Sequence, residues 1–193
     1  MKISEFNYKL PKNQIAKYPP KERGTSNLLV LDKRTGDTEH KKYFNIPEYI
    51  KEGDLVVLNE TKVINSRTYF TTPRGKEVEV LFLKKKDNDI WFSLIGRARN
   101  VREGDILKCE DISIEVGERE ENGFNVKFVE GDADTLFKKY GHTPLPPYMN
   151  REDTKEDKER YNTVFSSIPG AVAAPTASLN LTDEILEEIE KKG

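Results

Sequence analysis

Short apolar runs of strand length, separated by polar turn residues, recur along the first two thirds of the chain. Residues 28–31 form one such run, and a turn rich in charged residues separates it from a second extended stretch at 38–44. This order predicts a β-hairpin. A short helix is expected at 46–50, and the apolar run at 55–58 predicts another buried strand.

Between residues 63 and 130 the sequence alternates between short apolar stretches and turns at an even spacing. This rhythm is typical of a small closed or nearly closed β-barrel, because closure removes the strand edges that otherwise promote aggregation. The expected strands are at residues 78–83, 90–94, 106–109, 112–116 and 124–128.

The region after residue 130 has a different pattern. Asp132 is expected to cap a helix that ends before Gly141, and the proline-rich stretch 143–148 predicts a stiff, extended strap. Charged residues dominate 151–160, which predicts a mobile loop. Residues 161–165 are expected to form a strand.

Small residues occupy positions 170–174, where only Val172 has bulk, and Pro175 and Thr176 follow. Such a run lets the backbone approach another backbone or a flat ligand closely. Thr182 is expected to N-cap the final helix, so the stretch forms a tight turn with polar tips before a helix, a geometry that often faces a ligand. The alternative interpretation is an ordinary junction between a loop and a helix.

Composition limits the possible functions. The chain has 193 residues, enough for one good core or two small ones, and its net charge of −2 differs from the strongly basic balance of a nucleic-acid coat protein. Cys109 is the single cysteine, which excludes an internal disulfide and a cysteine-built metal site, and two distant histidines leave little material for another metal site. No apolar run approaches a membrane span and the first residues lack the apolar block of a signal peptide, so we expect a cytoplasmic location.

Several stretches of the chain, taken in order, resemble a single protein family. The stretch 141–148 reads Gly-His-Thr-Pro-Leu-Pro-Pro-Tyr. The other matching stretches are 10–19, 26–32, 53–64, 159–164 and 170–182. Together they resemble the S-adenosylmethionine:tRNA ribosyltransferase-isomerases of queuosine biosynthesis, often called QueA. The resemblance extends across the whole chain, and several long matches in order are more specific than any one motif.

The resemblance implies a mixed α+β fold, in which a layered and here incomplete α/β domain carries an inserted antiparallel β-barrel domain. The α/β domain is expected at residues 1–61 and 150–193, and the barrel at 62–149. The implied reaction transfers the ribosyl moiety of S-adenosylmethionine to 7-aminomethyl-7-deazaguanine at the tRNA wobble position and isomerises it, giving epoxyqueuosine-tRNA. S-adenosylmethionine is then a substrate, no separate cofactor is expected, and the tRNA anticodon stem-loop is the expected partner.

Two departures from the family pattern leave alternatives open. Family members continue well past the length of this chain, so a second chain that supplies a C-terminal half is a further expected partner. The family motif Gly-Leu-His-Phe-Thr is replaced by Ser-Leu-Asn-Leu-Thr at 178–182, which puts Asn180 in the place of an imidazole. Asparagine forms hydrogen bonds but cannot serve as a general base. The alternative function is therefore a truncated, inactive relative that binds RNA or a nucleoside.

The resemblance also implies a set of site residues. Tyr161, Thr176 and Asn180 are expected to have catalytic roles. The expected substrate-binding residues are Arg160, Thr163, Ala174, Pro175, Asn59, Thr61 and Arg67. Structural roles are the alternatives: a packed aromatic for Tyr161, an ion pair with an acidic neighbour for Arg160, and a cap at a strand end for Asn59 and Thr61.

Cations on the turns of the barrel are the expected RNA contacts, because phosphates dominate RNA affinity. The candidates are Lys84, Lys85, Arg97, Arg99 and Arg102. A solvated lysine turn is the alternative for the two lysines, since Asp87 and Asp89 follow at once. Trp91 and Phe92 alternate on a predicted strand, so one is expected in the core and the other is available to stack on a base.

Overall fold

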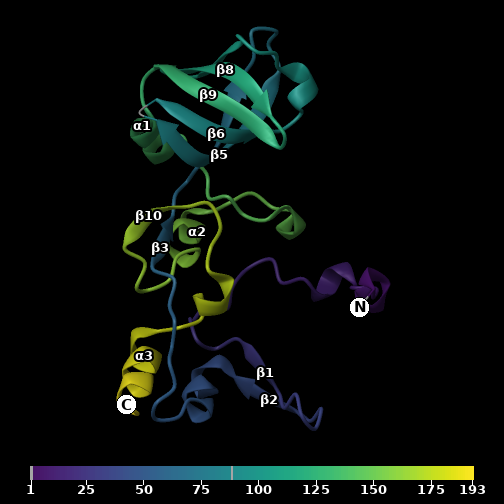
Figure 1. The fold of residues 1–193 in the computed structure, drawn as a ribbon, viewed down its shortest axis with the longest axis vertical. Helices are drawn as coiled ribbons and strands as arrows, with labels where there is room; N and C mark the ends of the chain where they lie inside the picture. Colours follow the sequence, from purple (N-terminus) through teal and green to yellow (C-terminus); the bar gives the residue numbers. More distant parts are fainter. Residues whose placement is uncertain (1, 88) are drawn as a thin grey trace.

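Six antiparallel strands close into a β-barrel at one end of the molecule (Figure 1). The computed structural model describes residues 2–87 and 89–193. Strands β3 and β10 lie with helix α2 in the middle, the β1–β2 hairpin and helix α3 lie at the other end, and the N-terminal residues project sideways as an arm. The strands are β1 (Asn27–Leu31), β2 (Thr38–Lys42), β3 (Thr61–Val63), β4 (Arg67–Thr71), β5 (Glu77–Asp87), β6 (Ile90–Ile95), β7 (Ile106–Cys109), β8 (Ile112–Glu120), β9 (Gly123–Glu130) and β10 (Ile168–Ala171). The α-helices are α1 (Ala133–Lys139), α2 (Lys155–Arg160) and α3 (Asp183–Glu190), and short 3-10 helices span Ile3–Phe6, Lys12–Gln14, Tyr43–Tyr49, Ala98–Asn100, Pro147–Met149 and Thr176–Ser178.

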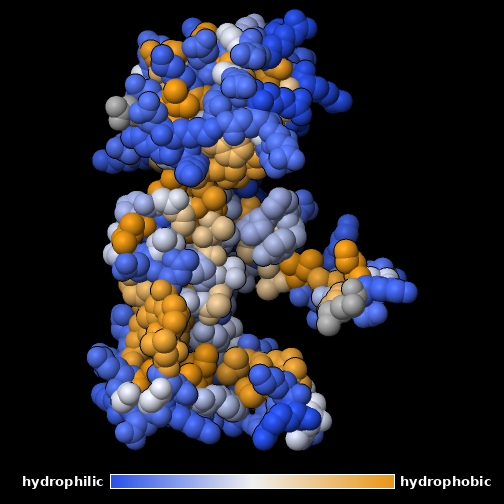
Figure 2. Space-filling model, viewed as in Figure 1, coloured by the Kyte–Doolittle hydropathy of each residue, from blue (hydrophilic) through white to orange (hydrophobic). Residues whose placement is uncertain are grey.

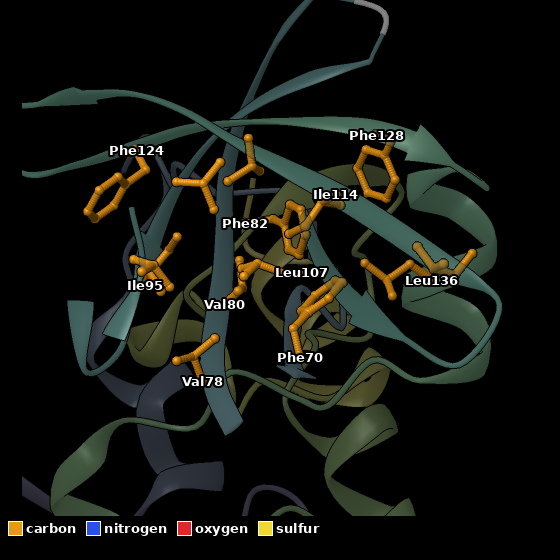
Figure 3. Close-up of a cluster of buried hydrophobic side chains, with 14 of the residues drawn as sticks. Phe70, Val78, Val80, Phe82, Ile95, Leu107, Ile114, Phe124, Phe128 and Leu136 are labelled. Carbon is orange, nitrogen blue, oxygen red and sulfur yellow. The ribbon is translucent and has the colours of Figure 1, made fainter. Parts of the chain in front are cut away.

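Side chains from all six strands fill the barrel. The strands follow the order β4-β5-β6-β9-β8-β7, and β7 pairs with β4 to close the ring. Alternate residues along each strand point inward, and Figure 3 shows them converging on the interior. The ring of Phe82 is fully buried, and its centroid lies 5.3–6.3 Å from those of Phe70, Trp91, Phe128 and Phe137. The barrel predicted from the strand rhythm is confirmed.

Helix α1 packs against the barrel. The carboxylate of Asp132 accepts hydrogen bonds from the backbone N–H of Thr135 at 2.8 Å and from its hydroxyl at 2.9 Å, which caps the first turn. Leu136 and Phe137 then join the barrel core, with exposed fractions of 0% and 9%. The helix predicted after Asp132 is therefore confirmed.

The chain enters and leaves the barrel at neighbouring positions. Arg67 and His142 form an antiparallel β-bridge, with backbone hydrogen bonds of 2.8 and 3.4 Å. Gly141 permits this approach, because a Cβ there would lie 2.1 Å from the carbonyl oxygen of Asn65. Strand β3, before the barrel, pairs in parallel with β10, after it. The expected mixed α+β fold with an inserted barrel is thus confirmed, while the domain bounds at 61/62 and 149/150 stay a prediction.

The 3-10 helix that follows the hairpin packs against the last helix at the end of the molecule away from the barrel. β1 and β2 form the predicted hairpin, although the second strand ends at Lys42 and the chain turns into a 3-10 helix, Tyr43–Tyr49. Thr182 caps α3 by accepting a hydrogen bond from the backbone N–H of Ile185 at 3.3 Å. The ammonium of Lys192 donates to the carbonyl of Ile50 at 3.4 Å, which ties the end of α3 to this 3-10 helix.

The strand predicted at 55–58 is wrong. This stretch has no regular structure, and Leu55 and Val57 are 88% and 82% exposed. An apolar run indicates that a segment favours burial, but a strand also needs a neighbour with which to pair, and within residues 2–87 and 89–193 no strand pairs with it. Figure 2 shows apolar side chains gathered beside α3, in the part of the molecule through which this stretch passes.

Two further expectations were wrong in the region that follows the barrel. Residues 151–160 are not a mobile loop, because Thr154 and Asp157 form a capping box that starts α2. The stretch 161–165 is not a strand but a turn that follows α2 directly. The aromatic and β-branched residues there favoured a strand by propensity, and tertiary packing decided otherwise. The parallel partner of β3 is instead β10, in the proline- and glycine-containing stretch Ile168–Ala171.

Candidate functional site

Four of the predicted site residues line one cavity of about 260 Å³ between the N-terminal arm, α2 and the turn before α3. They are Arg160, Tyr161, Thr176 and Asn180. The volume lies just below the ~300–1,000 Å³ that is usual for small-molecule sites. Four larger cavities among the described residues, of about 370 to 440 Å³, contain none of the four. We call this cavity the substrate pocket after the role that the sequence predicts for these four residues.

The turn that carries Asn180 is held in place by the loop at residues 23–26. The two terminal nitrogens of Arg23 donate to the carbonyls of Leu179 at 2.7 Å and Asn162 at 3.0 Å. The hydroxyl of Ser26 donates to the carboxamide oxygen of Asn180 at 2.8 Å. Sequence reasoning missed Arg23 and Ser26, since a short polar loop carries no local signal of a partner more than 130 residues away.

Tyr161 presents its ring to a small core and also lines the substrate pocket. It is 8% exposed and packs with Val63, Leu145 and Ala174. Burial raises the pKa of the Tyr161 hydroxyl, with a smaller contribution from the neighbouring Tyr148. The phenol is therefore protonated near neutral pH and acts as a hydrogen-bonding group, not as a base. The packed-aromatic alternative therefore describes Tyr161, and its catalytic role stays a prediction.

A buried ion pair forms one wall of the pocket. The guanidinium of Arg151 binds the carboxylate of Asp157 through two hydrogen bonds of 2.6 and 2.7 Å, and the two side chains are only 8% and 7% exposed. Asp157 also accepts from the backbone and the hydroxyl of Thr154. These partners hold the pKa of Asp157 below its usual value, with Arg151 as the main cause. The guanidinium of Arg151 also lies 4.4 Å from the ring centroid of Tyr18, which fixes the N-terminal arm.

Arg160 is held by the backbone of the arm. Its guanidinium donates to the carbonyl of Pro20 at 2.9 Å. Arg151, not Arg160, is the residue that takes the carboxylate of Asp157, so the expected alternative of an ion pair between Arg160 and Asp157 is wrong. Because one hydrogen bond uses a fraction of the five guanidinium donors, Arg160 retains donors for an anionic or carbonyl group in the pocket.

Three other predicted residues do not line the pocket. Thr163 is buried, and its hydroxyl has no hydrogen-bond partner among the described residues. Ala174 is buried against Tyr161, and the carbonyl of Pro175 accepts from the backbone of Ser178 at 2.9 Å. Ala174 and Pro175 belong to the segment that leads to Thr176 and Asn180, whereas Thr163 belongs to the turn after α2.

The remaining predicted substrate-binding residues lie outside the pocket. The Asn59 carboxamide oxygen accepts from the backbone and the hydroxyl of Thr61 at 3.0 and 2.7 Å, so the two residues cap the start of β3 and not the end of a strand at 55–58. Arg67 lies at the junction with the barrel, where it donates to the carbonyl of Leu145 at 3.0 Å and pairs with Glu79 at 3.2 Å. Leu145 itself lines the pocket, so Arg67 supports one wall from behind.

The five predicted RNA-binding cations divide into two groups at opposite ends of a barrel strand. Lys84 and Lys85 pair with the first half of β6, and Arg97 lies two residues after the end of this strand. Arg99 and Arg102 lie in the same connection as Arg97, beside Arg74, which donates to the carbonyl of Asn100. At about 3.3 Å per residue, the strand separates the two groups, so they do not form one continuous patch.

Neither a cluster of metal ligands nor a membrane-spanning helix occurs in residues 2–87 and 89–193. No group of three or more histidine, cysteine, aspartate or glutamate side chains in them is arranged to hold a metal ion. None of the helices in this part of the chain has the length and the apolar character needed to cross a membrane.

Comparison with known proteins identifies relatives along the whole chain. The chain is 42% identical to the S-adenosylmethionine:tRNA ribosyltransferase-isomerase of Aquifex aeolicus over 195 residues, which is 100% of this chain and 58% of that protein. It is 40% identical to the protein of the same name from Chlorobium phaeobacteroides, again over 100% of this chain and 57% of the relative. A crystal structure of an S-adenosylmethionine tRNA ribosyltransferase from Thermotoga maritima matches 98% of this chain and 55% of its own, with 30% identity and a TM-score of 0.40.

The chain thus spans a little more than half the length of the curated relatives that it matches. The family model described as queuosine biosynthesis protein matches residues 3–193, which is nearly all of the sequence. The chain therefore belongs to the queuosine biosynthesis protein family.

Proposed function

We propose that this chain binds S-adenosylmethionine and acts in its transfer to tRNA, as part of an S-adenosylmethionine:tRNA ribosyltransferase-isomerase. The observation that carries the proposal is the convergence of Arg160, Tyr161, Thr176 and Asn180 on one pocket. Relatives of that name, similar over the whole chain, support the choice of reaction. Because the proposed substrate is tRNA, we place the protein in the cytoplasm.

In this reaction the ribosyl part of S-adenosylmethionine moves to 7-aminomethyl-7-deazaguanine at the wobble position of a tRNA, and adenine and methionine leave. The positive sulfonium makes the adjacent C–H acidic, so an ordinary base suffices where water is excluded. The pocket residues are suited to binding: the protonated Tyr161, the Thr176 hydroxyl and the Asn180 carboxamide can hold ribose hydroxyls, and Arg160 can hold a carboxylate. The small volume suits the nucleoside part, with the amino-acid arm extending past the rim.

Binding of S-adenosylmethionine is the first test. At about 100 times its Kd the ligand is expected to add about 2.7 kcal/mol to the free energy of unfolding, because it binds the folded chain only. Thr176→Val removes the hydroxyl with little change of shape and is expected to weaken binding about tenfold, the value of one hydrogen bond. Ser167→Ala is the matched control, because Ser167 lies outside the pocket. Calorimetry that finds no binding, or equal binding by both variants, contradicts the proposal.

A second candidate function is binding without chemistry. Asn180 supports it, since its carboxamide cannot take up a proton and its oxygen already accepts from Ser26. Asn180→His restores an imidazole at this position. If chemistry needs that imidazole, the wild-type chain binds S-adenosylmethionine and RNA without releasing adenine, and the variant releases it. Release of adenine by the wild-type chain at the rate of the variant excludes this second function.

We further propose that another polypeptide covers the exposed apolar stretch at 55–58. Leu55 and Val57 are almost fully exposed, and such a patch is typical of an interface. The relatives are longer than the region they share with this chain, and their remaining part is a polypeptide of the kind that would cover this stretch. The assay of adenine release is therefore designed in two arms, without and with the remaining part of the Aquifex aeolicus relative.

A further inference from the structure

A separate cavity of about 440 Å³ lies where the barrel meets β10. Its apolar lining comes from Ile64, Trp91, Phe128 and Phe137, with Pro169 and Gly170 of β10 on the facing side. None of the residues with a proposed role in S-adenosylmethionine binding lines it. The two cavities are connected through the chain, because β10 continues directly into the segment that carries Thr176.

The aromatic side of this cavity is rigid. The ring centroid of Trp91 lies 6.0 Å from that of Phe82 and 5.4 Å from that of Phe137, and both pairs are edge-to-face. Phe82 and Phe137 belong to the buried barrel core, so the indole is fixed before any ligand arrives. A preformed apolar cavity with an indole in its lining suits a flat aromatic ligand.

The rim of the cavity carries separated charges. Lys84 and Lys85 are exposed, and neither takes part in an ion pair among the described residues, whereas the adjacent Lys86 pairs with Glu120. Asp89 and Asp134 also line the cavity. Cations at the rim suit a phosphate group, and free carboxylates accept hydrogen bonds from exocyclic amines.

We propose that this cavity binds an unpaired nucleobase of the RNA substrate, one with an exocyclic amine, while Lys84 and Lys85 contact the adjoining phosphates. This inference rests on the proposed function, because it takes RNA to be the partner. The base lies against the aromatic lining and directs its amine to Asp89 or Asp134. The position beside β10 places the neighbouring nucleotides along the segment that leads to the substrate pocket.

The chain contains a single tryptophan, so the emission of Trp91 reports on this cavity alone. Titration with oligocytidylate is expected to quench the emission to saturation. Oligouridylate of equal length differs by a carbonyl in place of the amine and is expected to bind about tenfold more weakly, a typical discrimination for one good polar contact. Equal quenching by the two strands contradicts the assignment of an amine.

Variants test the role of the cations at the rim and of the open volume inside the cavity. Lys84→Glu/Lys85→Glu is expected to weaken oligocytidylate binding by about tenfold or more and to flatten its salt dependence. Lys33→Glu/Arg34→Glu is the matched control, with the same change of charge on the β1–β2 turn, and is expected to stay within about twofold of the wild type. Ala133→Leu extends a side chain into the cavity and is expected to abolish quenching, with folding checked by circular dichroism.

The proposal is overturned if RNA binds without a change in Trp91 emission, if the two double variants weaken binding equally, or if folded Ala133→Leu is quenched as strongly as the wild type. If Ala133→Leu does not fold, the comparison of Lys84→Glu/Lys85→Glu with the control Lys33→Glu/Arg34→Glu still tests the proposal. S-adenosylmethionine is absent from every arm. A failure here therefore leaves the substrate pocket untouched, and a failure of S-adenosylmethionine binding leaves this test intact.

Discussion

Phe82→Ala is expected to lower the free energy of unfolding by about 3–5 kcal/mol, which is a large part of the stability of a small domain. The side chain is fully buried, and its ring contacts Phe70, Trp91, Phe128 and Phe137. Truncation removes the burial of a whole ring and leaves a cavity that the closed barrel cannot collapse to fill. Urea denaturation followed by Trp91 emission measures the loss, because Trp91 packs directly on this ring.

The matched control for this change is Leu94→Ala. Leu94 lies on β6 but is 39% exposed, so its truncation is expected to cost less than about 1 kcal/mol. A loss at Phe82 no larger than the loss at Leu94 contradicts the view that the aromatic cluster is the centre of the barrel.

Asp157→Ala is expected to cost about 3–5 kcal/mol, because it leaves the charge of the buried Arg151 guanidinium without its carboxylate counterpart. The same change removes the carboxylate that accepts from Thr154 and starts α2. Glu159→Ala is the control on the same helix: this residue is exposed, and its loss is expected to stay within about 0.5 kcal/mol. Chemical denaturation at neutral pH compares the two variants.

The Arg151–Asp157 pair also makes the free energy of unfolding depend on pH in the acid range. The folded-state pKa of Asp157 is lowered by Arg151, so its contribution is complete above the unfolded pKa of about 3.9. The contribution is lost as the pH falls toward the lower folded value, because the unfolded chain then binds the proton more readily. Asp157→Asn is expected to remove this part of the pH dependence between about pH 5 and the acid limit of folding. An unchanged profile in that variant counts against the pair as its source.

Local signals in the sequence were sufficient for the barrel, the hairpin and the two helices with clear caps. Along much of their length, the strands β5 and β9 alternate buried residues with half-buried or exposed ones, and that period belongs to each strand alone. Asp132 and Thr182 precede their helices as predicted caps. In these elements local preference and tertiary structure agree.

Other elements depended on partners that a local pattern does not contain. The run at 55–58 has the composition of a buried strand but no paired neighbour among the described residues. Helix α2 had a readable signal, Thr154 with Asp157 three positions later, but the density of charge suggested a loop. In the folded chain Arg151 forms a buried ion pair with Asp157, and this contact cannot be read from the local sequence.

The candidate site was predictable in part for the same reason. Tyr161, Thr176 and Asn180 come from motifs near one another in the chain, and the fold brings them to one pocket. Asn59 and Thr61 also came from a matching motif, yet they cap β3. Arg23 and Ser26 reach the site across the fold and have no motif of their own. The cations on the barrel turns were expected together, but the length of β6 keeps them apart.

The β-bridge between Arg67 and His142 bears on how the barrel could have been inserted into the surrounding domain during evolution. The first and last residues of the inserted barrel are hydrogen-bonded neighbours. The barrel can therefore be inserted or removed without a change in the path of the surrounding chain, because the two ends left behind lie only one strand pair apart. The surrounding polypeptide and the barrel are then free to diverge at different rates. The contact around Gly141 constrains the sequence of both parts, because a side chain at this position would clash with the backbone of Asn65.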